Sequence, residues 1–284
     1  MNKGTHTRYR GRHALLAALA LAALGLLTSC GQGLPADTPA YFSVPLEIAG
    51  ATVEEALIDT GGAFELVLRE PYGLKLVGTA EVLTFGGVAT VGVSQAVAYS
   101  AGGLDAQADF ALVGPAVCDC NALGYKFFQT SGTVLGVDFG AHRATLTAAI
   151  PARGLQLRRM DPSATLPDFA GAWVEVEVAV GGQSAVIPAV LDTGAAHSVL
   201  QRGTLPTVPA WPRDWVRATV AHKQLGTVSA SLYLFDTAGL PQLIIGLDLM
   251  RVWADEWYFE FTPAGGTVTV VIAAEDTADT ASSY

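Results

Sequence analysis

Two copies of the triplet Asp-Thr-Gly, 133 positions apart (192 − 59), are the residues of this chain best suited to do chemistry. The first starts at Asp59 after Leu57-Ile58, and the second starts at Asp192 after Val190-Leu191. The apolar residues before each Asp indicate a buried strand end, where a lone carboxylate is costly. Two carboxylates held about 3 Å apart cannot both ionise, so they would share one proton. The ionised one could then activate a water molecule while the protonated one polarises a carbonyl.

The surroundings of the two triplets also repeat, which predicts that the chain consists of two related halves. Upstream of each Asp, the pattern is typical of a strand, a Gly turn and a second strand that runs into the triplet. Downstream, a further short apolar segment occurs in both halves. The matched segments are 41–48 with 173–178, 52–58 with 185–191, and 65–68 with 197–200.

A glycine motif follows later in each half. We match Val134-Leu135-Gly136 with Ile244-Ile245-Gly246, because each is an apolar pair followed by Gly and, two residues later, by Asp. On this alignment the first half is the longer one between triplet and motif. The extra residues, about 104–132, are therefore interpreted as an insertion that decorates one half.

Together these motifs resemble the pepsin and retropepsin superfamily of aspartic proteases. Its members carry two apolar residues before Asp-Thr/Ser-Gly, then a flap hairpin, then an apolar-apolar-Gly motif. The resemblance covers roughly residues 41–262. It implies an all-β, bilobal pepsin-like acid-protease fold in which two pseudo-symmetric β-barrel lobes flank a central cleft. Each lobe would supply one catalytic residue, Asp59 or Asp192, and both lobes would lie in one monomeric chain.

The expected organisation has six segments. They are a lipoprotein signal peptide at 1–30, a tether at 31–40, an N-terminal lobe at 41–150, a linker at 151–172, a C-terminal lobe at 173–274 and a flexible tail at 275–284.

Four residues next to the two Asp are expected to support them. Gly61 and Gly194 would allow a tight turn and a close approach of backbone amides to the carboxylates. By the resemblance, Thr60 and Thr193 would exchange hydrogen bonds across the pseudo-two-fold axis and lock the lobes together.

A flap hairpin is expected between the motifs of the first half. Phe85, Gly86, Gly87 and Val88 fit its tip, since strand-like residues flank a Gly pair. The matching stretch of the second half is placed at 221–226, which has no Gly pair. The first hairpin is therefore expected to be the mobile cover and the second a static wall.

The chain departs from the pepsin pattern directly after each triplet. Pepsins usually carry Ser or Thr there, and its hydroxyl helps to hold the ionised carboxylate, whereas this chain has Gly62 and Ala195. Loss of a donor to the charged form raises the pKa of a carboxyl group. We therefore expect activity at mildly acidic rather than strongly acidic pH.

The N-terminus is expected to direct export. Four basic residues precede an apolar run at 14–27, which is too short for a comfortable membrane span. The run ends in Leu27-Thr28-Ser29-Cys30, which resembles a bacterial lipobox whose Cys is acylated. This predicts a lipid anchor at Cys30 and a place in the bacterial cell envelope, in the outer membrane and periplasm or on the cell surface. A plain signal peptide and an uncleaved anchor are the alternatives.

Charge and cysteine content narrow the possible partners. The formal net charge is −10 and becomes −14 once the basic residues Lys3, Arg8, Arg10 and Arg12 are removed, which argues against nucleic-acid binding. Cys118 and Cys120 could form a strained disulfide or remain two ordinary thiols. No cofactor is implied, and no metal site is expected because no His or Cys set has ligand spacing.

Four further residues could be mistaken for catalytic groups. Asp138 and Asp248 more readily cap or turn the chain after an apolar-Gly strand. His197 and His222 are expected in surface or cleft-lining roles.

The sequence thus predicts a membrane-anchored aspartic endopeptidase that hydrolyses peptide bonds of a peptide or protein substrate. The alternative is a catalytically idle lipoprotein of pepsin-like fold that binds peptides or serves assembly, because a fold alone does not establish activity.

Overall fold

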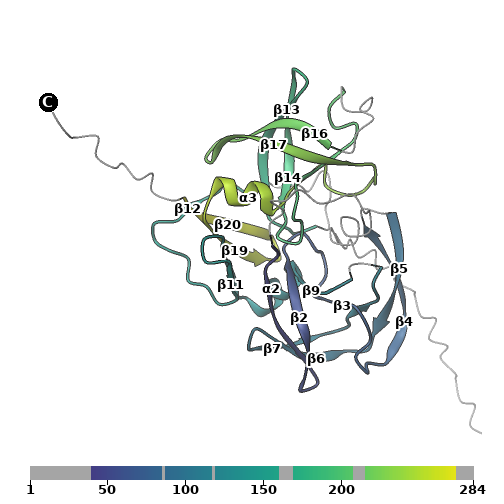
Figure 1. The fold of residues 1–284 in the computed structure, drawn as a ribbon. Helices are drawn as coiled ribbons and strands as arrows, with labels where there is room; N and C mark the ends of the chain where they lie inside the picture. Colours follow the sequence, from purple (N-terminus) through teal and green to yellow (C-terminus); the bar gives the residue numbers. More distant parts are fainter. Residues whose placement is uncertain (1–39, 85–86, 117–118, 160–168, 207–214, 273–284) are drawn as a thin grey trace, which may run out of the picture.

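The computed structural model describes residues 40–84, 87–116, 119–159, 169–206 and 215–272. These residues are mostly β-strands with two short helices, as predicted (Figure 1). Several predicted features fall outside the described residues: the signal peptide with Cys30, the flap residues Phe85 and Gly86, Cys118 and the tail at 275–284.

The first half of the chain forms a curled nine-stranded sheet in the order β4-β5-β8-β3-β9-β2-β1-β6-β7. Its strands are β1 (Ser43–Ile48), β2 (Ala51–Asp59), β3 (Leu66–Leu68), β4 (Leu76–Thr84), β5 (Gly87–Ser94), β6 (Val97–Ala101), β7 (Leu104–Ala108), β8 (Leu112–Val113) and β9 (Asn121–Gly124). Helix α2 (Tyr125–Ser131) follows β9 directly and ends at Gly132, which adopts the left-handed conformation common at helix ends.

The second half forms a closed six-stranded barrel in the order β13-β14-β18-β15-β17-β16. Its strands are β13 (Trp173–Val180), β14 (Gln183–Leu191), β15 (Val199–Gln201), β16 (Trp215–His222), β17 (Gly226–Phe235) and β18 (Leu243–Ile245). Helix α3 (Leu247–Trp253) follows β18 as α2 follows β9.

A third sheet combines strands from both halves, in the order β11-β10-β19-β20-β12. Its strands are β10 (Val134–Asp138), β11 (Arg143–Thr145), β12 (Leu155–Gln156), β19 (Glu256–Thr262) and β20 (Gly265–Val271). The central contact is the antiparallel pair β10–β19, which joins residues more than 100 positions apart. Backbone hydrogen bonds as well as side-chain packing therefore join the two halves.

The strands that lead to each Asp follow the predicted pattern. Alternate residues of β1 are buried, as expected for a strand with one face on the core. The turn between β1 and β2 is made by Ala49 and Gly50, and the turn between β13 and β14 by Gly181 and Gly182. All four residues have positive φ, the requirement of a tight two-residue hairpin turn.

The glycine motif of the first half differs from the prediction. Strand β9 lies between β2 and β3, parallel to β2 and antiparallel to β3, and β18 has the same relation to β14 and β15. The counterpart of Gly246 is therefore Gly124, at the end of β9, rather than Gly136. Gly136 instead lies in β10 of the third sheet.

The interpretation of 104–132 as a decorating insertion is wrong for the same reason. This segment contains β7, β8, β9 and α2, and β9 lies between β2 and β3. Removing it would leave a gap in the middle of the sheet directly beside the strand that carries Asp59.

A hairpin lies where the flap was predicted, but the turn expected to match it in the second half was misplaced. Strands β4 and β5 form an antiparallel hairpin whose register closes with Thr84 opposite Gly87. In the second half, the turn at 221–226 joins β16 to β17, and β16 pairs with β13 as β6 pairs with β1. That turn therefore matches the β6–β7 turn. The segment equivalent to β4–β5 lies between β15 and β16, where 207–214 fall outside the described residues.

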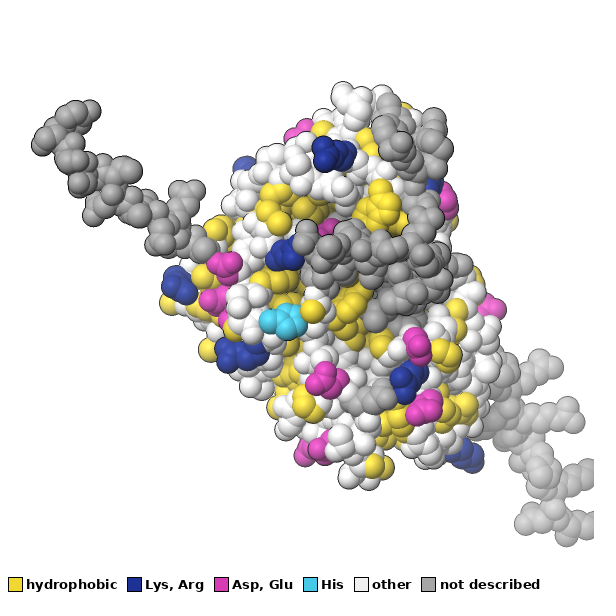
Figure 2. Space-filling view, in the orientation of Figure 1, with side chains coloured by type: hydrophobic (Ala, Val, Ile, Leu, Met, Phe, Trp, Pro, Cys, Tyr) yellow, Lys and Arg dark blue, Asp and Glu magenta, His cyan; other side chains and the backbone are white. Residues whose placement is uncertain are grey.

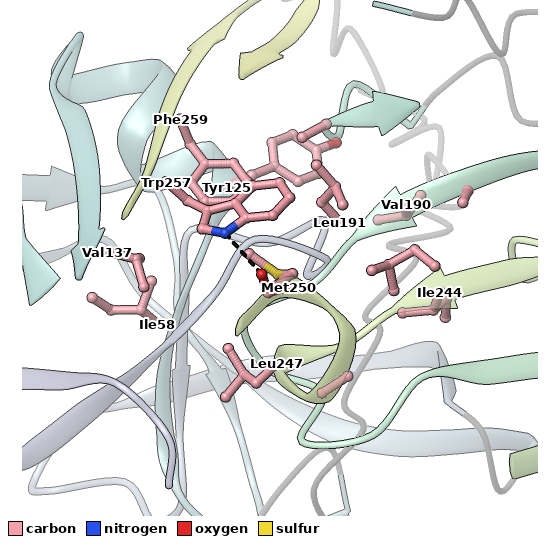
Figure 3. Packing of buried hydrophobic residues seen from close by; sticks show 14 of the residues in the cluster. Ile58, Tyr125, Val137, Val190, Leu191, Ile244, Leu247, Met250, Trp257 and Phe259 are labelled. Carbon is pink, nitrogen blue, oxygen red and sulfur yellow. Dashed lines mark hydrogen bonds between the residues drawn. The ribbon is translucent and has the colours of Figure 1, made fainter. Parts of the chain in front are cut away.

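One large core cluster of buried side chains draws on all three sheets. Figure 3 shows its centre, where Ile58 and Val137 of the first half lie near Leu247, Met250 and Trp257 of the second. The indole N–H of Trp257 donates to the carbonyl oxygen of Met250 at 3.1 Å, which satisfies a buried polar group. The core is thus shared between the halves.

No helix in the described part of the chain is long and apolar enough to cross a membrane. On the face shown in Figure 2, Lys and Arg side chains are scattered among Asp and Glu side chains.

The position of α2 in the shared core yields a stability test. Phe128 is fully buried and contacts Phe261 and Phe127. We expect Phe128→Ala to lower the free energy of unfolding by about 3–5 kcal/mol, as large core truncations do. The exposed neighbour variant Thr130→Ala should change the free energy of unfolding by less than about 0.5 kcal/mol, as measured by chemical denaturation. Small and equal effects of the two variants would contradict the assignment of α2 to the shared core.

Candidate functional site

The fold brings the two predicted Asp residues together at the junction of the halves. Asp59 is the last residue of β2, and Asp192 follows β14 directly. Both side chains are buried, with exposed fractions of 2% and 0%. Each lies at the carboxyl end of a strand paired with the Gly-motif strand of its own half, so equivalent elements position both groups.

Thr60 and Thr193 form a closed set of hydrogen bonds across the junction. The Thr60 N–H donates to Thr193 Oγ1 at 3.2 Å, and the Thr193 N–H donates to Thr60 Oγ1 at 3.0 Å. The Thr60 hydroxyl donates to the Leu191 carbonyl at 2.9 Å, and the Thr193 hydroxyl to the Ile58 carbonyl at 2.7 Å. The expected exchange is therefore present as four buried bonds, each of which would leave an unsatisfied partner if broken.

Gly61 and Gly194 lie against the carboxylate of the opposite half. A Cβ atom on Gly61 would lie 2.4 Å from Cγ of Asp192, and one on Gly194 would lie 2.6 Å from Cγ of Asp59. Both distances are shorter than any real contact between such atoms. Any larger residue at either position would push the two carboxyl groups apart, so the glycines set how closely they approach.

The same reasoning explains Gly62, which is unusual for the pepsin pattern. A Cβ atom there would lie 2.4 Å from the ring of Phe64 and 2.9 Å from Oδ2 of Asp59. The Phe64 ring thus occupies the space that a side chain at 62 would need. An apolar ring beside Asp59 also disfavours the charged form of this carboxyl group.

The environment raises the pKa of both carboxyl groups. For Asp59, burial raises the pKa well above its usual range, and the charge of Asp192 and the hydrogen bond between the two groups raise it further. For Asp192, burial raises the pKa to about 6, although a hydrogen bond from Asp59 and backbone N–H groups stabilise its charge. The N–H groups of Gly194 and Gly61 donate to Asp192 Oδ1 at 2.7 and 3.3 Å. The backbone donors therefore favour charge on Asp192, and burial next to Asp192 favours the protonated form of Asp59.

One residue near the pair was missed by the sequence analysis. Tyr41 lies just before β1, and burial raises the pKa of its phenol to about 12, with the charge of Asp192 and, to a smaller extent, that of Asp59 acting in the same direction. The signal that could have revealed it is the register of the first hairpin, which continues to place Tyr41 opposite Asp59.

The hairpin β4–β5 is the only part of the flap prediction that the described residues test. Val88 is 66% exposed, and Gly87 has a φ of +107°, which glycine adopts without strain. Leu83, near the tip, lies close to Gly239 of the second half. A Cβ atom placed on Gly239 would be 3.1 Å from the Leu83 side chain. The hairpin therefore reaches across to the other half.

The turn at 221–226 is fixed in place, although away from the position foreseen for it. Gln224 accepts from the Arg158 N–H at 2.9 Å and donates to the Gln156 carbonyl at 3.1 Å. His222 is buried beside Trp253, and burial lowers its pKa. This turn holds the segment that follows β12.

Asp138 turns the chain locally, as predicted, whereas Asp248 does not cap helix α3 and instead ties it to the distant Ser198. Asp138 Oδ1 accepts the Ala141 N–H at 2.8 Å. Asp248 Oδ1 accepts from the Ser198 N–H at 2.9 Å, from the Ser198 hydroxyl at 2.7 Å and from the Leu249 N–H at 2.8 Å. His197 is buried, with Nδ1 3.7 Å from Asp248 Oδ2 and its ring edge-on to Trp215.

Cys120 is disulfide-bonded, and its partner falls outside the described residues. Among the residues that are described, no group of three or more His, Cys, Asp or Glu side chains is arranged to hold a metal ion.

The sequence matches no known family model and no curated protein.

The raised pKa values predict how stability depends on pH. Between about pH 4 and pH 6 the unfolded chain has lost the Asp192 proton while the folded protein still holds it, so folding becomes less favourable as pH rises through this range. In the wild type, ionisation of Asp192 should lower the free energy of unfolding by up to roughly 3 kcal/mol between these pH values, and we expect this decrease to be absent in Asp192→Asn. Urea unfolding of both proteins at pH 4, 5, 6 and 7 measures this difference. Identical pH dependence of wild type and variant would contradict the raised pKa.

Proposed function

We propose that the chain is an aspartic endopeptidase in which Asp59 and Asp192 form the catalytic dyad. One observation carries the proposal: each carboxyl group is buried against the glycine of the opposite half, while Thr60 and Thr193 bond across the same junction. Burial of two like-charged groups in contact is costly. Shared-proton chemistry gives this costly arrangement a purpose that a purely structural role does not.

We also propose that the fold is the bilobal pepsin-like one. The equivalent order of strands around Asp59 and Asp192 supports this, as do the two helices that follow the Gly-motif strands. A third sheet built from both halves would then serve as the base that joins the lobes.

In the proposed reaction, Asp192 takes a proton from a water molecule as the water oxygen attacks the carbonyl carbon of the scissile peptide bond. Asp59 gives its proton to the carbonyl oxygen, so a neutral tetrahedral diol forms. When the diol collapses, the proton held by Asp192 passes to the amide nitrogen and the C–N bond breaks. A diol hydroxyl returns its proton to Asp59 as the new carboxyl group forms, which restores the starting state.

The direction of proton flow follows from the asymmetry of the pair. The backbone N–H groups of Gly194 and Gly61, 2.7 and 3.3 Å from Asp192 Oδ1, favour the ionised form of Asp192, and the apolar ring beside Asp59 favours the protonated form. Asp192 is therefore proposed as the general base and Asp59 as the general acid.

The substrate is proposed to be a peptide in extended conformation. The β4–β5 hairpin, with its exposed tip residue Val88, would cover it and bind its backbone as an added strand. Export and a lipid anchor at Cys30 remain part of the proposal and would deliver this activity to the cell envelope.

The dyad is tested directly with the isosteric variants Asp59→Asn and Asp192→Asn. We expect each to reduce kcat for cleavage of a mixed peptide library by at least about a thousandfold, because neither half of the proton exchange works alone. The exposed variant Glu175→Gln on β13 serves as the control and should keep full activity. Cleavage that survives either dyad substitution would refute the mechanism. Peptide binding without cleavage by the wild type would favour the idle binding module.

The pH dependence of activity provides an independent test. Because Asp192 must be ionised, kcat/KM should fall on the acid side with a midpoint near pH 6, the pKa of its carboxyl group. At pH 2 the rate should be less than about one-hundredth of the maximum. A maximum near pH 2 in a peptide-cleavage assay would contradict the assignment.

A further inference from the structure

We propose that Tyr41 belongs to the active site as a positioning residue whose hydroxyl holds the charge on Asp192. It would provide the hydroxyl that Gly62 and Ala195 lack. This inference rests on the proposed dyad, but one of its two tests does not require peptide cleavage.

The backbone places Tyr41 beside the dyad. In the hairpin β1–β2, Ser43 pairs with Leu57 and Val44 with Ala56. The Ile58 N–H donates to the Phe42 carbonyl at 2.9 Å, so the same register continues one residue further. The next position in this register pairs Tyr41 with Asp59.

The side chain of Tyr41 reaches across to the other half of the molecule. Its hydroxyl accepts the backbone N–H of Ala196, four residues after Asp192. Its ring packs against both apolar core clusters, including the one that contains Phe64 and Leu57. Anchored at the ring and at the oxygen, the hydroxyl has little freedom, and its own proton remains available to an acceptor.

Two buried oxygens of the dyad, Asp59 Oδ1 and Asp192 Oδ2, have no hydrogen-bond partner among the described residues, so either could accept this proton. The charge of Asp192 acts on the Tyr41 phenol more strongly than that of Asp59. Burial and the two Asp charges together raise the pKa of Tyr41 to about 12, so the phenol keeps its proton throughout the working range. No Lys, Arg or His side chain of the described residues contributes to the pKa of Asp59, Asp192 or Tyr41.

The second half has no such residue. The Leu191 N–H donates to the Ala172 carbonyl at 3.0 Å, just as Ile58 bonds to Phe42, and the matching register position opposite Asp192 is Gly171. A Cβ at Gly171 would lie 2.2 Å from the ring of Phe169, so this position has no room for a tyrosine. One hydroxyl therefore serves a site that is otherwise built from matching halves, and it favours charge on one carboxylate.

The kinetic test compares Tyr41→Phe with Tyr99→Phe. Tyr99 is a matched control because its buried hydroxyl also makes a hydrogen bond, to Glu65 Oε1 at 3.0 Å, but lies outside the dyad. Loss of a donor to the ionised form raises the pKa of Asp192, so Tyr41→Phe should move the acid limb of kcat/KM upward by roughly half to one pH unit. The loss of kcat/KM should be about three- to tenfold at pH 5 and small at pH 7.5. An unshifted acid limb, or an equal shift in Tyr99→Phe, would overturn the inference.

The second test follows the ¹³Cζ resonance of Tyr41 by NMR between pH 4 and 8, assigned with Tyr41→Phe. The resonance should shift with a midpoint near pH 6 as Asp192 ionises, and Asp192→Asn should abolish this step. If the Tyr41 resonance does not shift as Asp192 ionises, the inference is wrong even if the protein cleaves peptides. A coupled resonance in a protein that cleaves nothing would uphold the contact and reject the proposed function instead.

Discussion

The structure depends on burying two carboxyl groups against each other at the meeting point of two half-molecules. Neither Asp59 nor Asp192 could be buried singly at acceptable cost, because an isolated charge in an apolar interior is strongly destabilising. The crossed Thr hydrogen bonds and the two close-packed glycines hold the groups together, so a single proton can neutralise half of the pair. The arrangement on which the proposed chemistry depends also weakens the fold as pH rises, because both carboxyl groups have raised pKa values.

The sequence alone located the parts of this site that depend on local pattern. The triplets, their leading strands and the glycine turns were predicted because each depends on residues that are adjacent in the sequence. The Thr exchange joins residues 133 positions apart and was expected only from the family resemblance. The local turn made by Asp138 was predicted because it too depends on residues close in the sequence, whereas the bond of Asp248 to Ser198, 50 residues away, was not.

The errors concern contacts between distant segments. Val134-Leu135-Gly136 imitates the true motif at 122–124 closely, since both are short apolar strands that end in Gly, and only strand pairing separates them. The turn at 221–226 was mistaken for a flap because hairpins look alike until their neighbours are known. Tyr41 was missed because its place near the two Asp residues shows only in strand register and in its interaction with Ala196, which no local pattern encodes.

The third sheet has a consequence for how the protein is made. Strand β10 finds its partner β19 only when residues 256–262 exist, and β19 in turn is closed by β20, which ends at Val271. During synthesis the first half must therefore wait with the edge of β10 unpaired, an arrangement prone to association with other chains. The proposed catalytic pair would then be complete only when almost the whole polypeptide has emerged, so the topology would keep the nascent chain from cleaving peptides.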